Sequence, residues 1–268
     1  ERPVRFHPGV SYRHLMVWKD GAKAVKTTPP HDISDKPIAS WLPKGDRAEK
    51  LQRLMELSWA VMKDHPTNKK RIAAGKKPAT SIWLWGQGSA PAMPTMRTRF
   101  GKEGAIISAV DLMKGIGIYA GLEVINVPGA TGYIDTNYAG KAEAALRALE
   151  TKDFVCVHVE APDEAGHNGN LKDKLQAIED FDEKIVGPVV KGAAKFGDIA
   201  VLVLPDHPTP IAIKTHTSDP VPFVLYRSGA KGASSKFSEK GAKATGVLVE
   251  DCQALAEEFF GMAEKAGA

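Results

Sequence analysis

The stretch FVCVHVE (residues 154–160), a helical pattern from Leu171 to about Lys195, and IAVLVLPD (199–206) together decide the fold class. Near-continuous apolar runs are typical of strands that are buried on both faces of a sheet. The same alternation of strands and helices continues on either side, in GAIISAVD (104–111), Met113 to Ala120, LEVINVP (122–128), Tyr138 to Leu149, PVPFVLY (220–226) and a terminal helix around Glu250 to Glu264. We therefore expect an α/β fold with a mostly parallel sheet and helices on both faces.

A break in this pattern lies at GQGSAPAMP (residues 86–94), where glycine and proline interrupt regular structure. The part before it is small and poor in strands. It contains strand-like YRHLMVW (12–18), a loop at TTPPHDISDKP (27–37) and helical spacing from Asp46 to Asp64. We therefore predict two parts, residues 1–90 and residues 91–268.

Composition narrows the class of protein. The formal charge of +4 arises from 36 basic and 32 acidic residues, and this excess is too small to indicate nucleic-acid binding. No apolar run approaches the roughly twenty residues that cross a membrane. The two cysteines, Cys156 and Cys252, give no disulfide framework and fit a reducing compartment, so we expect a cytoplasmic location.

Three short motifs concentrate metal-ligand side chains within about sixty residues. Asp163 and His167 lie in HVEAPDEAGH, Asp206 and His207 in VLPDHPTP, and His216 in KTHTSDPVPF. The first two motifs follow predicted strands, and parallel sheets place their ligand sites at the carboxyl ends of the strands. Carboxylate and imidazole ligands without nearby thiolate suit manganese, zinc or magnesium. The motifs predict a two-metal site for phosphoryl transfer.

A simpler interpretation of each motif stays open at this point. Asp163 and His167 could form a capping turn with an exposed imidazole, and Asp206 with His207 could be a polar loop. A single Asp-His pair is more often structural than ligating, whereas three elements together favour a metal site.

The segments HVEAPDEAGHNG, VLPDHPTP and KTHTSDPVPF resemble the archaeal-type branch of the cofactor-independent (2,3-bisphosphoglycerate-independent) phosphoglycerate mutases, in the alkaline phosphatase superfamily. The resemblance extends through WLWGQGSAPAMP, AIISAVDLMKGIG and VPGATGYIDTNYAGKAEAAL, and so covers most of the chain from Trp83 onward. It implies an alkaline phosphatase-like sheet. Residues 1–90 would be a remnant of an inserted substrate-binding domain, and residues 91–268 the C-terminal part of the metal-binding phosphatase-like domain.

The resemblance also implies a ligand set and a reaction. One metal ion would be held by Asp163, His167 and His216, and a second partly by Asp206 and His207. The two ions would be manganese, zinc or magnesium, and 2,3-bisphosphoglycerate would not be needed. The implied substrate is a small phosphorylated metabolite, because the family interconverts 3-phosphoglycerate and 2-phosphoglycerate through a phosphoserine. A nucleic-acid or membrane partner is not expected.

This sequence departs from the family's pattern because it does not match the half that carries the phosphorylated serine and another metal-binding aspartate. We therefore expect an inactive C-terminal fragment with its nucleophile upstream, and we do not assign that role to Ser11, Ser89 or Ser108. Two alternatives remain. Relatives on this branch have been proposed to phosphorylate other small metabolites such as homoserine, and the fragment could be a noncatalytic metal-binding module.

Candidate substrate contacts are less well defined. Lys114 matches the neighbourhood of a family lysine that contacts the phosphoryl group, and Arg13 with His14 could meet a carboxylate or phosphate. Such residues are more often simply solvated. His158 and Glu160 are expected to hydrogen-bond around the metal site rather than to bind an ion directly.

Overall fold

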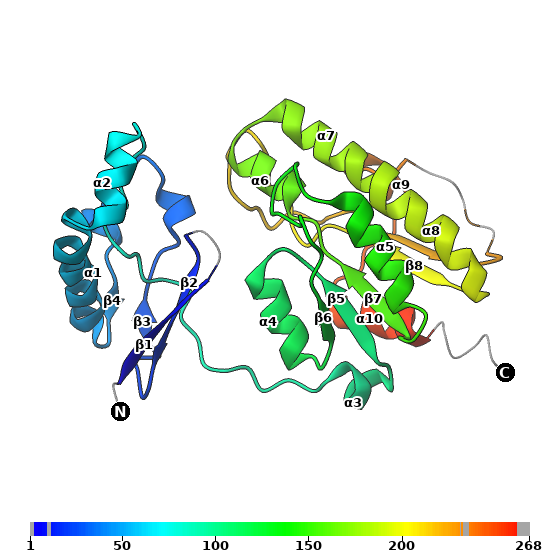
Figure 1. Cartoon of the computed structure of the whole chain (residues 1–268). Coiled ribbons are helices and arrows are strands. Elements are labelled where there is room, and N and C mark those ends of the chain that lie inside the picture. The colour runs from blue at the N-terminus through cyan, green and yellow to red at the C-terminus, as the bar shows by residue number, and fades with distance from the viewer. Residues whose placement is uncertain (1–2, 10–11, 231, 233–235, 262–268) are drawn as a thin grey trace. The chain divides into compact units, whose positions relative to one another are not determined.

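A computed structural model describes residues 3–9, 12–230, 232 and 236–261, and the chain divides into two compact units, Glu1–Pro91 and Ala92–Ala268 (Figure 1). The predicted end of the terminal helix at Glu264 lies outside the described residues. None of the helices in the described part is long and apolar enough to cross a membrane.

The first unit joins short antiparallel strands to two helices. Strand β1 (Val4–Pro8) pairs with β2 (His14–Trp18), and β3 (Val25–Lys26) pairs with β4 (Lys44–Gly45). Two short 3₁₀ turns, η1 (Pro30–Ile33) and η2 (Ile38–Trp41), precede α1 (Ala48–Lys63) and α2 (Pro66–Ala73). The predicted strand at 12–18 and helix at 46–64 are therefore confirmed.

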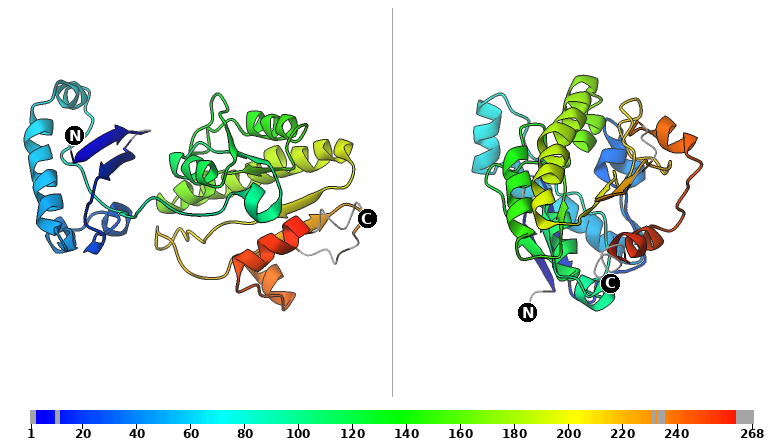
Figure 2. Two further views of the ribbon diagram at one scale, coloured as in Figure 1. Left: turned by 90° about the horizontal axis from the view of Figure 1, so that it is seen from below. Right: turned by 90° about the vertical axis from the view of Figure 1, so that its right-hand side faces the viewer.

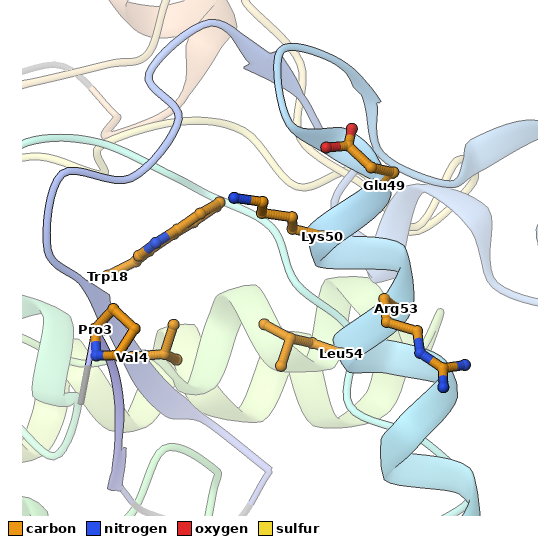
Figure 3. Close-up of a pocket in the computed structure, with 7 residues that line it drawn as sticks. All are labelled: Pro3, Val4, Trp18, Glu49, Lys50, Arg53 and Leu54. Atoms are coloured by element: carbon orange, nitrogen blue, oxygen red, sulfur yellow. The ribbon is translucent and has the colours of Figure 1, made fainter.

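The core of this unit forms where α1 covers the strands. Leu51 and Met55 are buried four residues apart on one helix face, and Leu51 packs with Val25. A pocket of about 480 Å³ in the same unit is lined by residues of β1 and α1. Figure 3 shows Val4 and Leu54 pointing toward one another across it.

The second unit is built on three parallel strands. Its sheet has the order β6 (Glu123–Ile125), β5 (Gly104–Ile107), β7 (Phe154–Val157). Helix α3 (Met96–Phe100) precedes the sheet, α4 (Asp111–Tyr119) connects β5 to β6, and α5 (Tyr138–Ala148) connects β6 to β7. The strands and crossover helices lie where the apolar runs predicted them.

Helices cover both faces of this sheet, and neighbouring residues of each strand point to opposite faces. Ile107 packs on Ala144 and Ala145 of α5, whereas Ile106 faces Gly117 of α4. On the α4 side, Phe154 meets Phe260 of α10 (Cys252–Gly261) with ring centroids 4.9 Å apart. Figure 2 shows α10 on the opposite side of the unit from α5. The predicted α/β class is confirmed.

The long helix predicted from Leu171 to about Lys195 has an internal irregularity. It consists of α7 (Leu171–Phe181), a π-helical turn η3 (Asp182–Val186), α8 (Gly187–Ala193) and a 3₁₀ turn η4 (Ala194–Phe196). In the widened π turn the Gly187 N–H bonds to the carbonyl of Asp182. Pro188, the next residue, has no backbone N–H to donate.

The last two strands correct one detail of the predicted topology. Strands β8 (Ala200–Val203) and β9 (Val224–Arg227) pair with each other antiparallel, with Leu202 opposite Leu225, instead of joining the parallel order of the described sheet. The long connection between them carries two of the metal motifs. The remaining helices are α6 (Ala161–His167) directly after β7, and α9 (Glu239–Ala244) after β9.

Candidate metal centre

The first motif is positioned by the start of α6. This helix begins four residues after β7 ends, with Pro162 in its first turn, where a missing N–H costs nothing. Asp163 and His167 are one helical turn apart and therefore share a face. His167 Nε2 lies 3.3 Å from Asp163 Oδ2.

The second and third motifs reach the same place from the connection between β8 and β9. The rings of His207 and His216 lie against each other at a tilt of 34°, with centroids 3.7 Å apart. His216 Nε2 lies 3.3 Å from Asp163 Oδ1 and 3.0 Å from His167 Nε2. Donor atoms of Asp163, His207 and His216 all lie within 4.8 Å of one another. We call Asp163, His167, His207 and His216 the metal cluster.

The donor set of the metal cluster fits a divalent ion. One carboxylate and three imidazoles are the ligand types that zinc and manganese accept in proteins. The orientation of His167 also fits, because its Nδ1 lies 3.0 Å from the carbonyl oxygen of Lys214. A carbonyl only accepts, so Nδ1 carries the proton and the lone pair of Nε2 points toward Asp163 and His216.

Asp206 is the predicted ligand that the structure does not bring into the cluster. Its side chain is 75% exposed, and its Oδ2 lies 3.5 Å from Nε2 of the neighbouring His207. Its other oxygen accepts the backbone N–H of His207. The carboxylate therefore faces solvent beside the cluster.

Three residues that sequence reasoning missed hold the two motif loops against each other. The Thr209 hydroxyl donates to Asp163 Oδ1, and Lys174 Nζ donates to the Thr209 carbonyl over 2.6 Å. Gly166 of α6 lies so close that a Cβ there would be 2.4 Å from the Thr209 carbonyl oxygen. A threonine in a proline-rich loop and a lysine on a helix carry no sequence signal for this contact.

A second polar group lies at the carboxyl ends of β5 and β7. Lys141 of α5 is fully buried, and its Nζ donates to the His158 carbonyl over 3.2 Å. His158 Nδ1 lies 3.0 Å from Ser108 Oγ, and His158 Nε2 lies 3.4 Å from Glu160 Oε2. We call these four residues the Lys141 network. The predicted role of His158 and Glu160 as hydrogen-bonding neighbours matches these contacts.

Burial governs the ionisation of this network. It lowers the pKa of Lys141 to about 8, although the negative charge of Glu160 acts in the opposite direction. Burial also lowers the pKa of His158, against the attraction of Asp206 and Asp163, while Lys141 adds to the lowering. His158 is therefore held in its neutral form.

The predicted substrate contacts belong to both units of the chain. Lys114 is half-buried on α4, and its backbone N–H bonds to the Val110 carbonyl. Arg13 and His14 belong to the other unit. There the Arg13 guanidinium lies 4.8 Å from the centre of the Tyr12 ring, and His14 Nδ1 accepts the Gly9 N–H.

The α/β fold and the gathered carboxylate and imidazoles define a metal-dependent enzyme class. The family model for the metalloenzyme superfamily matches residues 42–254, and that for 2,3-bisphosphoglycerate-independent phosphoglycerate mutase matches residues 1–68. This chain belongs to the metalloenzyme superfamily.

Relatives named 2,3-bisphosphoglycerate-independent phosphoglycerate mutase confirm the resemblance predicted from the motifs. The mutase of Methanosarcina acetivorans is 59% identical over 85% of this chain and 58% of its own length. That of Methanosarcina barkeri is 54% identical over 90% of this chain and 61% of its own length. A solved structure of a Pyrococcus horikoshii protein is 28% identical with a TM-score of 0.61, covering 74% of this chain and 52% of that one. The chain thus spans about three fifths of the length of these curated relatives.

Proposed function

We propose that this chain supplies the metal-holding part of a 2,3-bisphosphoglycerate-independent phosphoglycerate mutase, which interconverts 3-phosphoglycerate and 2-phosphoglycerate. The observation that carries the proposal is the metal cluster, in which three separate motifs bring Asp163, His167, His207 and His216 together. Close relatives that bear the mutase name support this choice of reaction.

In this proposal the cluster and its neighbour Asp206 hold two divalent ions. Asp163, His167 and His216 hold one, and His207 with Asp206 contributes to the second, with manganese, zinc or magnesium as the ions. Such ions, when bound, would activate a serine oxygen and neutralise charge on the transferred phosphoryl group. The side chains of the cluster and Asp206 would fix the positions of the two ions.

The nucleophilic serine is not assigned to this chain. Ser108 is 3% exposed, and its hydroxyl oxygen accepts the Val110 N–H and contacts His158, so it is already engaged and buried. We propose that residues 91–268 serve as the metal-binding part of the phosphatase-like domain and residues 1–90 as part of a substrate-binding domain. Lys114, Arg13 and His14 are the proposed substrate contacts, and the cytoplasm the proposed location.

The experiment extends the chain with the remaining segment of the Methanosarcina acetivorans relative and measures conversion of 3-phosphoglycerate in the presence of manganese. We expect conversion by the extended protein, none by the 268-residue chain, and loss of conversion on His216→Ala. A homoserine phosphorylation assay runs beside it. An extended, manganese-loaded protein that leaves 3-phosphoglycerate unchanged would exclude the mutase reaction.

A further inference from the structure

We propose that Thr209 is a positioning residue of the metal centre, whose hydroxyl fixes both the rotamer of Asp163 and the tautomer of His207. The inference deepens the proposed function, because it rests on the metal cluster binding a divalent ion. It concerns a residue outside the ligand set, and its consequences are measured by metal affinity and histidine spectra instead of turnover.

Thr209 occupies the point where the motif loops meet. The residue is 4% exposed, and its hydroxyl oxygen lies between Asp163 Oδ1, to which it donates, and His207 Nδ1 at 3.3 Å. Asp163 Oδ1 is also the oxygen that lies 3.3 Å from His216 Nε2. The Thr209 hydroxyl therefore contacts Asp163 and His207 directly, and it bonds to the same Asp163 oxygen that lies next to His216.

The proton count decides the tautomer of His207. A threonine hydroxyl has one proton, and an ionised carboxylate has none to give, so the hydroxyl proton goes to Asp163. The same hydroxyl oxygen can then only accept from His207, which places the proton of His207 on Nδ1. The lone pair of His207 is left on Nε2, the nitrogen through which an imidazole with an occupied Nδ1 binds a metal ion.

His167 reaches the same result by a different contact. Its Nδ1 donates to the backbone carbonyl of Lys214 over 3.0 Å, which also leaves the Nε2 lone pair for an ion. Lys214 holds that carbonyl in place from a left-handed backbone conformation, with φ of 56°. Two histidines of the cluster are thus set to the same tautomer, one by a main-chain carbonyl and one by the Thr209 hydroxyl.

The backbone of Thr209 is anchored independently of its hydroxyl. Lys174 Nζ donates to the Thr209 carbonyl over 2.6 Å, and the absence of a side chain at Gly166 lets that carbonyl approach α6. A substitution that removes only the hydroxyl therefore leaves the loop's main anchor in place. This separates a positioning role from a purely structural one.

The chain offers a matched comparison in Thr217. It follows a cluster residue, His216, and its hydroxyl oxygen is buried without a hydrogen-bond partner in the described part of the chain. Thr217→Val removes a buried hydroxyl beside the metal centre without removing a contact to a ligand. Thr209→Val removes the same atoms together with both contacts.

The experiment titrates the metal-free 268-residue chain with Mn²⁺ and with Zn²⁺ by calorimetry, for the wild type, Thr209→Val, Thr209→Ala, Thr209→Ser and Thr217→Val. Loss of a hydrogen bond behind a metal ligand typically weakens affinity about 10- to 100-fold. We expect that loss for the Val and Ala variants at Thr209, recovery to within a few-fold of wild type for Ser, and wild-type affinity for Thr217→Val.

Nitrogen NMR of the histidine rings in the metal-free protein supplies the second readout. We expect the proton of His207 on Nδ1 in the wild type and in Thr209→Ser, and loss of that preference in Thr209→Ala. Unchanged affinity of the Val and Ala variants, or equal losses for Ser and for Thr217→Val, would overturn the role of the hydroxyl while leaving the metal centre standing. A wild-type chain that binds neither ion would overturn the metal centre itself and this inference with it.

Discussion

The metal cluster and the Lys141 network both lie beyond the carboxyl end of β7, but only the network contains a permanent cation. The Lys141 network contains its own cation, since the Lys141 ammonium bonds to the His158 carbonyl and is attracted by Glu160. The metal cluster combines one carboxylate with three imidazoles, none of which is a permanent cation.

This difference separates binding from support. When the lone pairs of several side chains converge, the free energy of binding an ion offsets the cost of removing those side chains from water. A buried ammonium is stable only when hydrogen-bond acceptors surround it. The Lys141 network contacts the segment between β7 and α6, at His158 and Glu160. Asp163 and His167 lie in α6, which follows this segment. We infer that the network supports the position of the ligands and that the cluster binds the ion.

The largest expected effect tests the binding half of this comparison. His216→Ala should weaken Mn²⁺ or Zn²⁺ binding by at least about 100-fold, because His216 Nε2 lies within 3.3 Å of donor atoms of both Asp163 and His167. Calorimetric titration measures the loss. The control is His7→Ala, which removes an exposed histidine in the other unit and should leave affinity unchanged. Equal losses in both variants would remove the distinction between the cluster and any surface histidine.

The next effect tests the supporting half through the pH dependence of stability. Burial lowers the pKa of Lys141 to about 8 from its usual value of 10.5. Between these two values the unfolded chain binds more protons than the folded chain, so this residue makes the free energy of unfolding rise with pH. Lys141→Met should remove that rise, which amounts to about 3 kcal/mol at most.

Urea denaturation of the wild type and Lys141→Met at pH 7 and pH 10 measures this difference. The exposed Lys77→Met variant serves as the control and should follow the wild-type curve. If Lys141→Met and the wild type gain the same stability between the two pH values, the Lys141 ammonium is not the buried cation that the comparison requires.

A smaller effect is expected where the cluster is held together by close packing. Gly166→Ala should weaken metal binding by about tenfold, because a Cβ would come within 2.4 Å of the Thr209 carbonyl oxygen and push the loop of His207 away from Asp163. Gly115→Ala is the control, since its added Cβ meets no atom within 4 Å. Calorimetry and thermal unfolding of both variants separate affinity from stability. Unchanged affinity for Gly166→Ala would show that the two loops move apart without harm to the site.

The sequence predicts this arrangement as far as its patterns are local. Apolar runs locate β5, β6 and β7 because buried parallel strands need them, and the Asp-x-x-x-His spacing places two ligands on one face of α6. The antiparallel pairing of β8 with β9 joins residues that are 21 to 27 positions apart in the sequence, and apolar content alone does not specify such a pairing.

The supporting residues are harder to predict for a related reason. A lysine on a helix ordinarily lies in solvent, so nothing in the pattern of α5 marks Lys141 as buried. Thr209 likewise sits among prolines in a loop, and its role depends on the approach of α6. Ligands can be recognised by residue type, whereas the residues that position them are identified only by the packing.

The smallest expected effect sharpens the boundary of the metal cluster. Asp206 was predicted as a ligand beside His207, but its side chain is 75% exposed and its contacts are with His207 at 3.5 Å and 3.1 Å. Asp206 and His207 are proposed to hold only part of the second site, so Asp206→Asn should change the affinity of the tighter site of this 268-residue chain by less than about threefold. The same titration with His207→Ala should show a clear loss, because a donor atom of His207 lies within 4.8 Å of those of Asp163 and His216. A loss for Asp206→Asn as large as that for His207→Ala would place Asp206 among the ligands of the tighter site, and would mean that the adjacent Asp-His pair binds that ion as a unit.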